Sequence, residues 1–113
     1  MKKIFINEKL EALLNYPGEI IKNIKEVIAT LDENYGQNRD VDKDLGGYVL
    51  IVENIKDIDE LKQDKLQGLV PEHTDLIECK EGVNWTSSLF LLSSDYSIIV
   101  VCTEELSKYL IER

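Results

Sequence analysis

Residues 84–102 read NWTSSLFLLSSDYSIIVVC, and this stretch decides the fold. Two runs rich in apolar, β-branched and aromatic residues, at about 84–92 and 97–102, flank Ser93-Ser94-Asp95. Serine and aspartate favour a reversal of the chain, and the flanking residue types favour strands. The pattern therefore predicts two antiparallel strands joined by a short turn.

Two more strands are expected upstream of this pair. One covers about 75–80 and is followed by a reversal at Glu81-Gly82, so that the last three strands form an antiparallel meander. The other covers 47–52 (GYVLIV) and ends at Glu53. Because a helix is expected between 47–52 and 75–80, these two strands are expected to run parallel if they share a sheet, with a right-handed crossover.

Helices are predicted where apolar residues recur at helical spacing. The clearest stripe consists of Ile20, Ile21, Ile24, Val27, Ile28, Leu31 and Tyr35. A short helix over 8–15 is capped by Asn7, and the last helix is capped by Thr103. A further helix starts at a capping box, with Asp57 as N-cap and Glu60 as its third residue, and closes at Gly68. The expected fold is one α+β domain over residues 1–113, a small mixed four-stranded sheet packed with about four helices.

Three of the expected strands are continuously apolar and do not alternate. They are Tyr48–Val52, Leu89–Leu92 and Ile98–Val101. Such runs are typical of strands that are buried on both faces. Four helices, two of them short, are barely enough to cover both faces of the sheet. The alternative is that one face is covered by a second copy of the chain, in a homodimer, or by an obligate partner. Trp85 and Phe90 are an odd number of positions apart, so they are expected to face opposite sides of their strand. Both are candidates for core packing, and an exposed Trp85 would be an interface anchor.

The chain is strongly acidic, with a formal net charge of −9. Residues 1–40 carry 7 acidic and 6 basic side chains, whereas residues 41–113 carry 15 acidic and 7 basic ones. A negative field repels phosphate backbones and anionic lipids, so direct binding to nucleic acid or to a membrane is disfavoured. The same field favours a basic protein partner, and the alternative is that the acidity only maintains solubility.

The two cysteines, Cys79 and Cys102, lie in separate apolar runs without metal-binding spacing. We expect free thiols in a reducing compartment. The basic start of the chain, with Lys2 and Lys3, is followed by only three apolar residues before Glu8, too few for a signal peptide. A cytoplasmic protein is expected.

Three candidate sites are weak. Asp40-Val41-Asp42-Lys43-Asp44 alternates carboxylates as a calcium loop does, but Leu45 and Ile51 occupy the positions that require glycine and glutamate. Gly46-Gly47 precedes a strand and not a helix, so we interpret it as a turn into the sheet and not as a phosphate loop. The only histidine, His73, is interpreted as a surface residue in a loop, and no residue set is expected to hold a metal or other cofactor.

The most concentrated charge lies between residues 53 and 81, with nine acidic and four basic side chains. We predict that this segment contains the protein-binding surface, whose candidate residues are Asp57, Asp59, Glu60, Asp64 and Glu72. Carboxylates that occupy a basic, phosphate-binding surface are the means by which nuclease inhibitors, immunity proteins, antitoxins and nucleic-acid mimics act. The sequence thus favours a non-enzymatic module that binds, and by binding inhibits, a basic protein. The alternative is a small enzyme or ligand-binding domain whose site the sequence does not reveal.

Overall fold

In the computed structural model the described residues are 2–5, 13–35, 47–93 and 96–111. They contain five strands and three helices, so the α+β class is confirmed and the predicted number of strands is one too low. The elements are, in chain order, β1 (Lys2–Phe5), α1 (Gly18–Tyr35), β2 (Gly47–Ile51), α2 (Ile55–Gln63), β3 (His73–Ile77), β4 (Trp85–Ser93), β5 (Tyr96–Thr103) and α3 (Glu104–Ile111).

All five described strands belong to one mixed sheet, in the order β1-β2-β5-β4-β3. The meander β3-β4-β5 is antiparallel, as predicted. β1 pairs antiparallel with β2, and β2 pairs parallel with β5. β2 and β3 belong to the same sheet and run parallel, as predicted, but they are not neighbours, because β5 and β4 lie between them. The parallel neighbour of β2 is the last strand, which no local pattern indicates.

Gly47 allows β2 to enter the sheet next to β5. Its φ of 113° is in the region that favours glycine, and a Cβ at this position would clash with the carbonyl oxygen of Ser97 on β5. The interpretation of this glycine as a turn into the sheet is confirmed. Gly46 lies outside the described residues.

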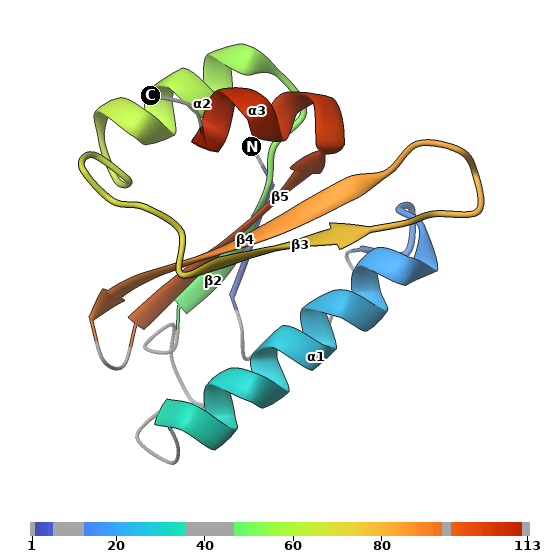
Figure 1. The fold of residues 1–113 in the computed structure, drawn as a ribbon, viewed down its shortest axis with the longest axis horizontal. Coiled ribbons are helices and arrows are strands. Elements are labelled where there is room, and N and C mark those ends of the chain that lie inside the picture. Colours follow the sequence, from blue (N-terminus) through green and yellow to red (C-terminus); the bar gives the residue numbers. More distant parts are fainter. Residues whose placement is uncertain (1, 6–12, 36–46, 94–95, 112–113) are drawn as a thin grey trace.

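The helices cover both faces of the sheet (Figure 1). On one face, α1 packs its buried residues Ile20, Ile24, Val27 and Leu31 against residues of β2, β4 and β5. On the other face, α2 and α3 contribute Ile58, Leu61 and Leu110 to a second apolar cluster. Phe90 belongs to this second cluster and Trp85 packs against the first, so the two aromatic residues face opposite sides as predicted. The burial of the central strands on both faces is therefore achieved within one chain and does not by itself require a partner.

The start and end of α2 differ from the prediction. Asn54 is the N-cap, with its side-chain oxygen accepting from the N–H of Asp57 at 2.9 Å, so Asp57 is the third residue of the helix and not its cap. The helix ends at Gln63 and does not continue to Gly68. The prediction failed because Asn54 and Asp57 are both good N-cap residues. For α3, the predicted cap is confirmed, since the N–H of Leu106 donates to Thr103 Oγ1 at 3.4 Å.

Some predictions concern residues that the structure does not describe. The helix expected over 8–15 falls mostly on residues 6–12, and the acidic loop with its calcium-like pattern falls on 36–46.

Candidate functional site

The five candidate residues do not form one patch. Asp57, Asp59 and Glu60 lie on α2, and Asp64 is the residue that ends this helix. Glu72 directly precedes β3, at the sheet edge three strand spacings from β2, or roughly 14 Å. The structure thus brings four of the five together on the α2 side and leaves Glu72 with the edge strand.

Asp57 has a local role in the fold. It is half-buried in the first turn of α2, where a carboxylate interacts favourably with the helix dipole. By contrast, Asp59, Glu60 and Asp64 are exposed, and their side chains form no hydrogen bond or ion pair with any described residue. These three carboxylates therefore remain available to a partner.

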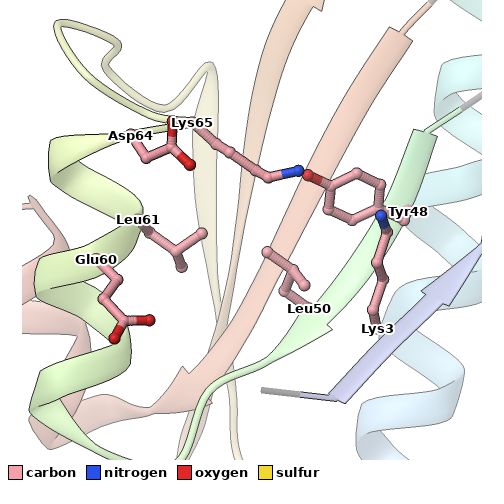
Figure 2. A pocket seen from close by; sticks show the side chains of 7 residues that line it. All are labelled: Lys3, Tyr48, Leu50, Glu60, Leu61, Asp64 and Lys65. Atoms are coloured by element: carbon pink, nitrogen blue, oxygen red, sulfur yellow. The ribbon is translucent and has the colours of Figure 1, made fainter.

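Glu60 and Asp64 line a hollow of about 280 Å³ between α2 and the strands β1 and β2 (Figure 2). Its other lining residues are Lys3, Tyr48, Leu50, Leu61 and Lys65. In Figure 2 the two carboxylates lie on the helix side, the amino groups of the two lysines lie near Tyr48, and the two leucines lie between them. Asp59 is turned about 100° from Glu60 on the helix and is not part of the lining.

The positive end of the hollow is built around Tyr48, whose side chain is almost fully buried. The amino nitrogen of Lys3 lies 4.3 Å from the centroid of the Tyr48 ring, and that of Lys65 lies 5.3 Å from it. Both distances are within the range of a cation–π interaction. A hydrogen bond with the Tyr48 hydroxyl raises the pKa of Lys65, so this amine is charged at neutral pH.

The hollow is consequently bipolar and not uniformly acidic. Sequence reasoning missed Lys3 because it did not predict β1, the strand that brings this lysine beside Tyr48. It missed Tyr48 as a site residue because an apolar run indicates only a buried strand. The two lysines at the start of KKIF were the one signal that favoured an edge strand at this position, since lysines are common on edge strands.

His73 lies on β3 and not in a loop, and its side chain is exposed as expected. Its Nδ1 is 3.7 Å from a carboxylate oxygen of Asp75, and both side chains are about two-fifths exposed. The other end of β3 is roughly 13 Å of extended chain from His73, and Cys79 lies beyond that end. The hydroxyl of Ser87 donates to Asn23 at 2.6 Å and not to the histidine. No nucleophile is thus paired with His73 in the part of the chain that the structure describes.

Both thiols are buried and free. Burial raises the pKa of Cys102 and of Cys79, and for Cys79 the nearby charges of Glu19 and Glu81 raise the pKa further. Neither cysteine therefore has the lowered pKa of a reactive thiolate. Within the described ranges, no cluster of three or more histidine, cysteine or acidic side chains is arranged to hold a metal ion.

None of the described helices has the length and apolar character needed to span a membrane. No known protein family matches the chain, and no curated protein or solved structure is significantly similar to it.

Proposed function

We propose that this chain is a non-enzymatic, cytoplasmic interaction module that binds a basic protein through the acidic surface of α2. The observation that carries the proposal is that Asp59, Glu60 and Asp64 are exposed and unengaged by the described fold. Carboxylates that do not stabilise the fold are available to steer and bind a positively charged partner.

The charge between residues 53 and 81 is also presented at the surface. Of the nine acidic side chains in this segment, seven are exposed and two are half-buried. Only some of them have local partners. Glu53 accepts a hydrogen bond of 2.6 Å from the Tyr16 hydroxyl, which raises the pKa of Tyr16 to about 12, and Asp75 accepts one from Asn23. The exposed acidic residues without such a partner contribute negative potential at the surface, some at α2 and others near the edge strand β3.

The hollow beside α2 supports the same function. A lysine or arginine of the partner, placed with its stem on Leu50 and Leu61, would bring its charge to Glu60 and Asp64. The amines of Lys3 and Lys65 would then face an acidic group of the partner. A partner that uses its basic surface to bind phosphate groups would be inhibited by this occupation.

The test measures association of the partner with the variant Asp59→Asn/Asp64→Asn. The partner is first captured from the native host with the wild-type chain and must be basic and stoichiometric. Association rates are then compared at low and at physiological salt. We expect the variant to associate more slowly, on the order of several-fold at low salt, with a flatter salt dependence.

The matched control is Glu33→Gln/Glu105→Gln, which removes the same charge from exposed positions outside α2 and outside residues 53–81. We expect it to leave the rate close to that of the wild type. If the α2 variant and the control behave alike, the acidity serves solubility and the proposal fails.

A second candidate function is the binding of a small ligand with separated charges, and the bipolar lining of the hollow favours it. Free amino acids and dipeptides would be tested as ligands by thermal shift. A rise in melting temperature that is lost in Lys65→Met/Glu60→Gln would support this candidate over the protein-binding one.

A further inference from the structure

The strand β3 forms one edge of the sheet. It pairs with β4 and with no other described segment. In a strand that is paired on one side only, alternate residues direct their N–H and C=O groups outward, where another strand can pair with them. The chain on both sides of β3, from residue 47 to residue 93, is described, and no strand within it pairs with this edge.

The face of β3 on the α2 and α3 side is open. Leu76 is 50% exposed, although Thr86, its direct partner on β4, is only 4% exposed. Thr74 is exposed as well, while Ser88 opposite it is buried. The apolar cluster under α2 and α3 contains no residue of β3. These helices therefore cover the sheet as far as β4 and leave an apolar side chain uncovered at the edge.

The other face of β3 borders an acidic groove. This groove, of about 260 Å³, lies between α1 and the end of β3, and its charged lining residues are Glu19, Lys22, Glu26 and Glu78. A carboxylate oxygen of Glu19 accepts a hydrogen bond of 2.9 Å from the backbone N–H of Lys80, and this hydrogen bond lowers the pKa of Glu19. The groove thus has three acidic side chains and one basic side chain.

The position of β3 relative to α1 is fixed by a polar chain. Asn23 of α1 donates to Asp75 at 3.2 Å and accepts from Ser87 of β4 at 2.6 Å. Since Asp75 and Ser87 are direct partners across the two strands, Asn23 joins the helix to both. The open edge and the acidic groove are consequently held in one arrangement.

We propose that β3 accepts an extended segment of a basic protein as a sixth strand of the sheet. Pairing with the outward backbone groups would place alternate side chains of that segment on opposite faces. Those on the α1 face meet the carboxylates of the groove and are basic. Those on the other face lie beside Leu76 and are apolar. The recognised segment is therefore one in which basic and apolar residues alternate.

A second copy of this chain is a poor occupant of the same edge. Antiparallel pairing of two β3 strands about a twofold axis normal to the sheet would place the two acidic grooves on the same face. Like charges on one face of the combined sheet oppose association. Pro71 and the inward-facing Asp75 also limit self-pairing, as they do at many natural sheet edges. This protection by negative charge does not act against a basic strand.

The inference specifies the partner class of the proposed function but uses a different surface from α2. The test uses three seven-residue peptides: alternating lysine and valine, the same sequence with alternate backbone nitrogens methylated, and alternating glutamate and valine. Binding to the full chain is followed by the chemical shifts and the hydrogen exchange of the β3 amides. We expect the lysine peptide to protect amides of β3 and to bind at least tenfold more tightly than the methylated peptide, which keeps its charge but cannot form the ladder.

Three variants assign the result to the site. We expect Glu26→Lys/Glu78→Lys to weaken binding of the lysine peptide at least tenfold. Glu33→Lys/Glu105→Lys, which makes the same charge change at exposed positions away from β3, should leave the affinity close to that of the wild type. Loss of binding in the α2 variant Asp59→Asn/Asp64→Asn alone would support the α2 surface and overturn the β3 site. Equal binding of the methylated peptide would show that charge alone is recognised, which also overturns strand addition. A dimer whose exchange protection maps to β3 would identify a second copy as the occupant and would contradict the proposal.

Discussion

The strands β5 and β3 belong to the same sheet but have opposite environments. Six of the eight residues of β5 are buried, whereas only one of the five residues of β3 is. Ser97, a polar residue of β5, is 0% exposed, and Leu76, an apolar residue of β3, is 50% exposed. Position in the sheet therefore overrides residue type at both sites. We therefore expect the centre of the sheet to contribute more to the stability of this fold than its edge does.

The largest difference between the two strands is expected when an apolar side chain is shortened in each. Ile99 of β5 is fully buried, so Ile99→Ala should lower the free energy of unfolding by about 2–5 kcal/mol, since it removes buried contacts and leaves a cavity. Leu76→Ala on β3 should change it by less than about 0.5 kcal/mol. Denaturant unfolding of both variants gives the comparison. Similar losses would mean that β3 is covered in solution.

A smaller effect is expected where β2 enters the sheet beside β5. Gly47→Ala combines a positive φ with a clash against the Ser97 carbonyl, and we expect a loss of about 1–3 kcal/mol or more. Gly82→Ala, in the turn between β3 and β4, is the matched control. Gly82 also has a positive φ of 97°, but nothing lies within 4 Å of the added Cβ. If Gly82→Ala costs as much as Gly47→Ala, then the contact between β2 and β5 is not the source of the loss.

The two cysteines sharpen the comparison further, because Cys102 lies on β5 and Cys79 lies just beyond β3. We expect Cys102→Ser to cost about 1 kcal/mol and Cys79→Ser to cost less, with partner binding unchanged in both. In the native protein, Cys79 should be alkylated by iodoacetamide before Cys102, since the edge of a sheet opens locally at lower cost than its centre. Faster labelling of Cys102 would contradict this order.

The smallest effect is expected at Glu19, whose carboxylate holds the chain after β3 against α1. Its pKa is lower in the folded protein than its usual value of 4.5, chiefly because of the hydrogen bond from the Lys80 N–H. The ionised form therefore stabilises the folded state above pH 4.5, and this contribution is lost as the pH falls through the lowered pKa. Glu19→Gln should be slightly less stable than the wild type at pH 7, and the two should converge on acidification. A difference that persists at pH 3 would assign the effect to packing.

The sequence predicts those elements whose signal is local. α1 is indicated by a long apolar stripe of period 3.6, and β2, β4 and β5 are indicated by continuous runs of β-forming residues. β1 was missed because it has only four residues, two of them lysines, and becomes a strand by pairing with β2. The central place of β5 was missed because it depends on a pairing between residues about 50 positions apart, such as Tyr48 and Ile98.

The same distinction applies to the candidate site. The exposure of Asp59, Glu60 and Asp64 follows from their charge and their positions off the apolar stripe of α2, and that of Glu72 follows from its charge; the structure agrees. Their arrangement in space does not follow from the sequence. The hollow requires Lys3 from β1, and the separation of Glu72 from the others requires the strand order.

The parallel pairing of β2 with β5 has a consequence for how the chain folds. β5 is the last described strand in chain order, but it supplies the contacts that join β1 and β2 to β3 and β4. Two-stranded units are at best marginally stable in water, so neither pair is expected to persist before β5 arrives. The entropy of closing a long loop must be overcome before this central pairing forms, which slows folding. We therefore expect a chain shortened to residue 95 to remain unfolded and prone to aggregation, although it contains four of the five strands.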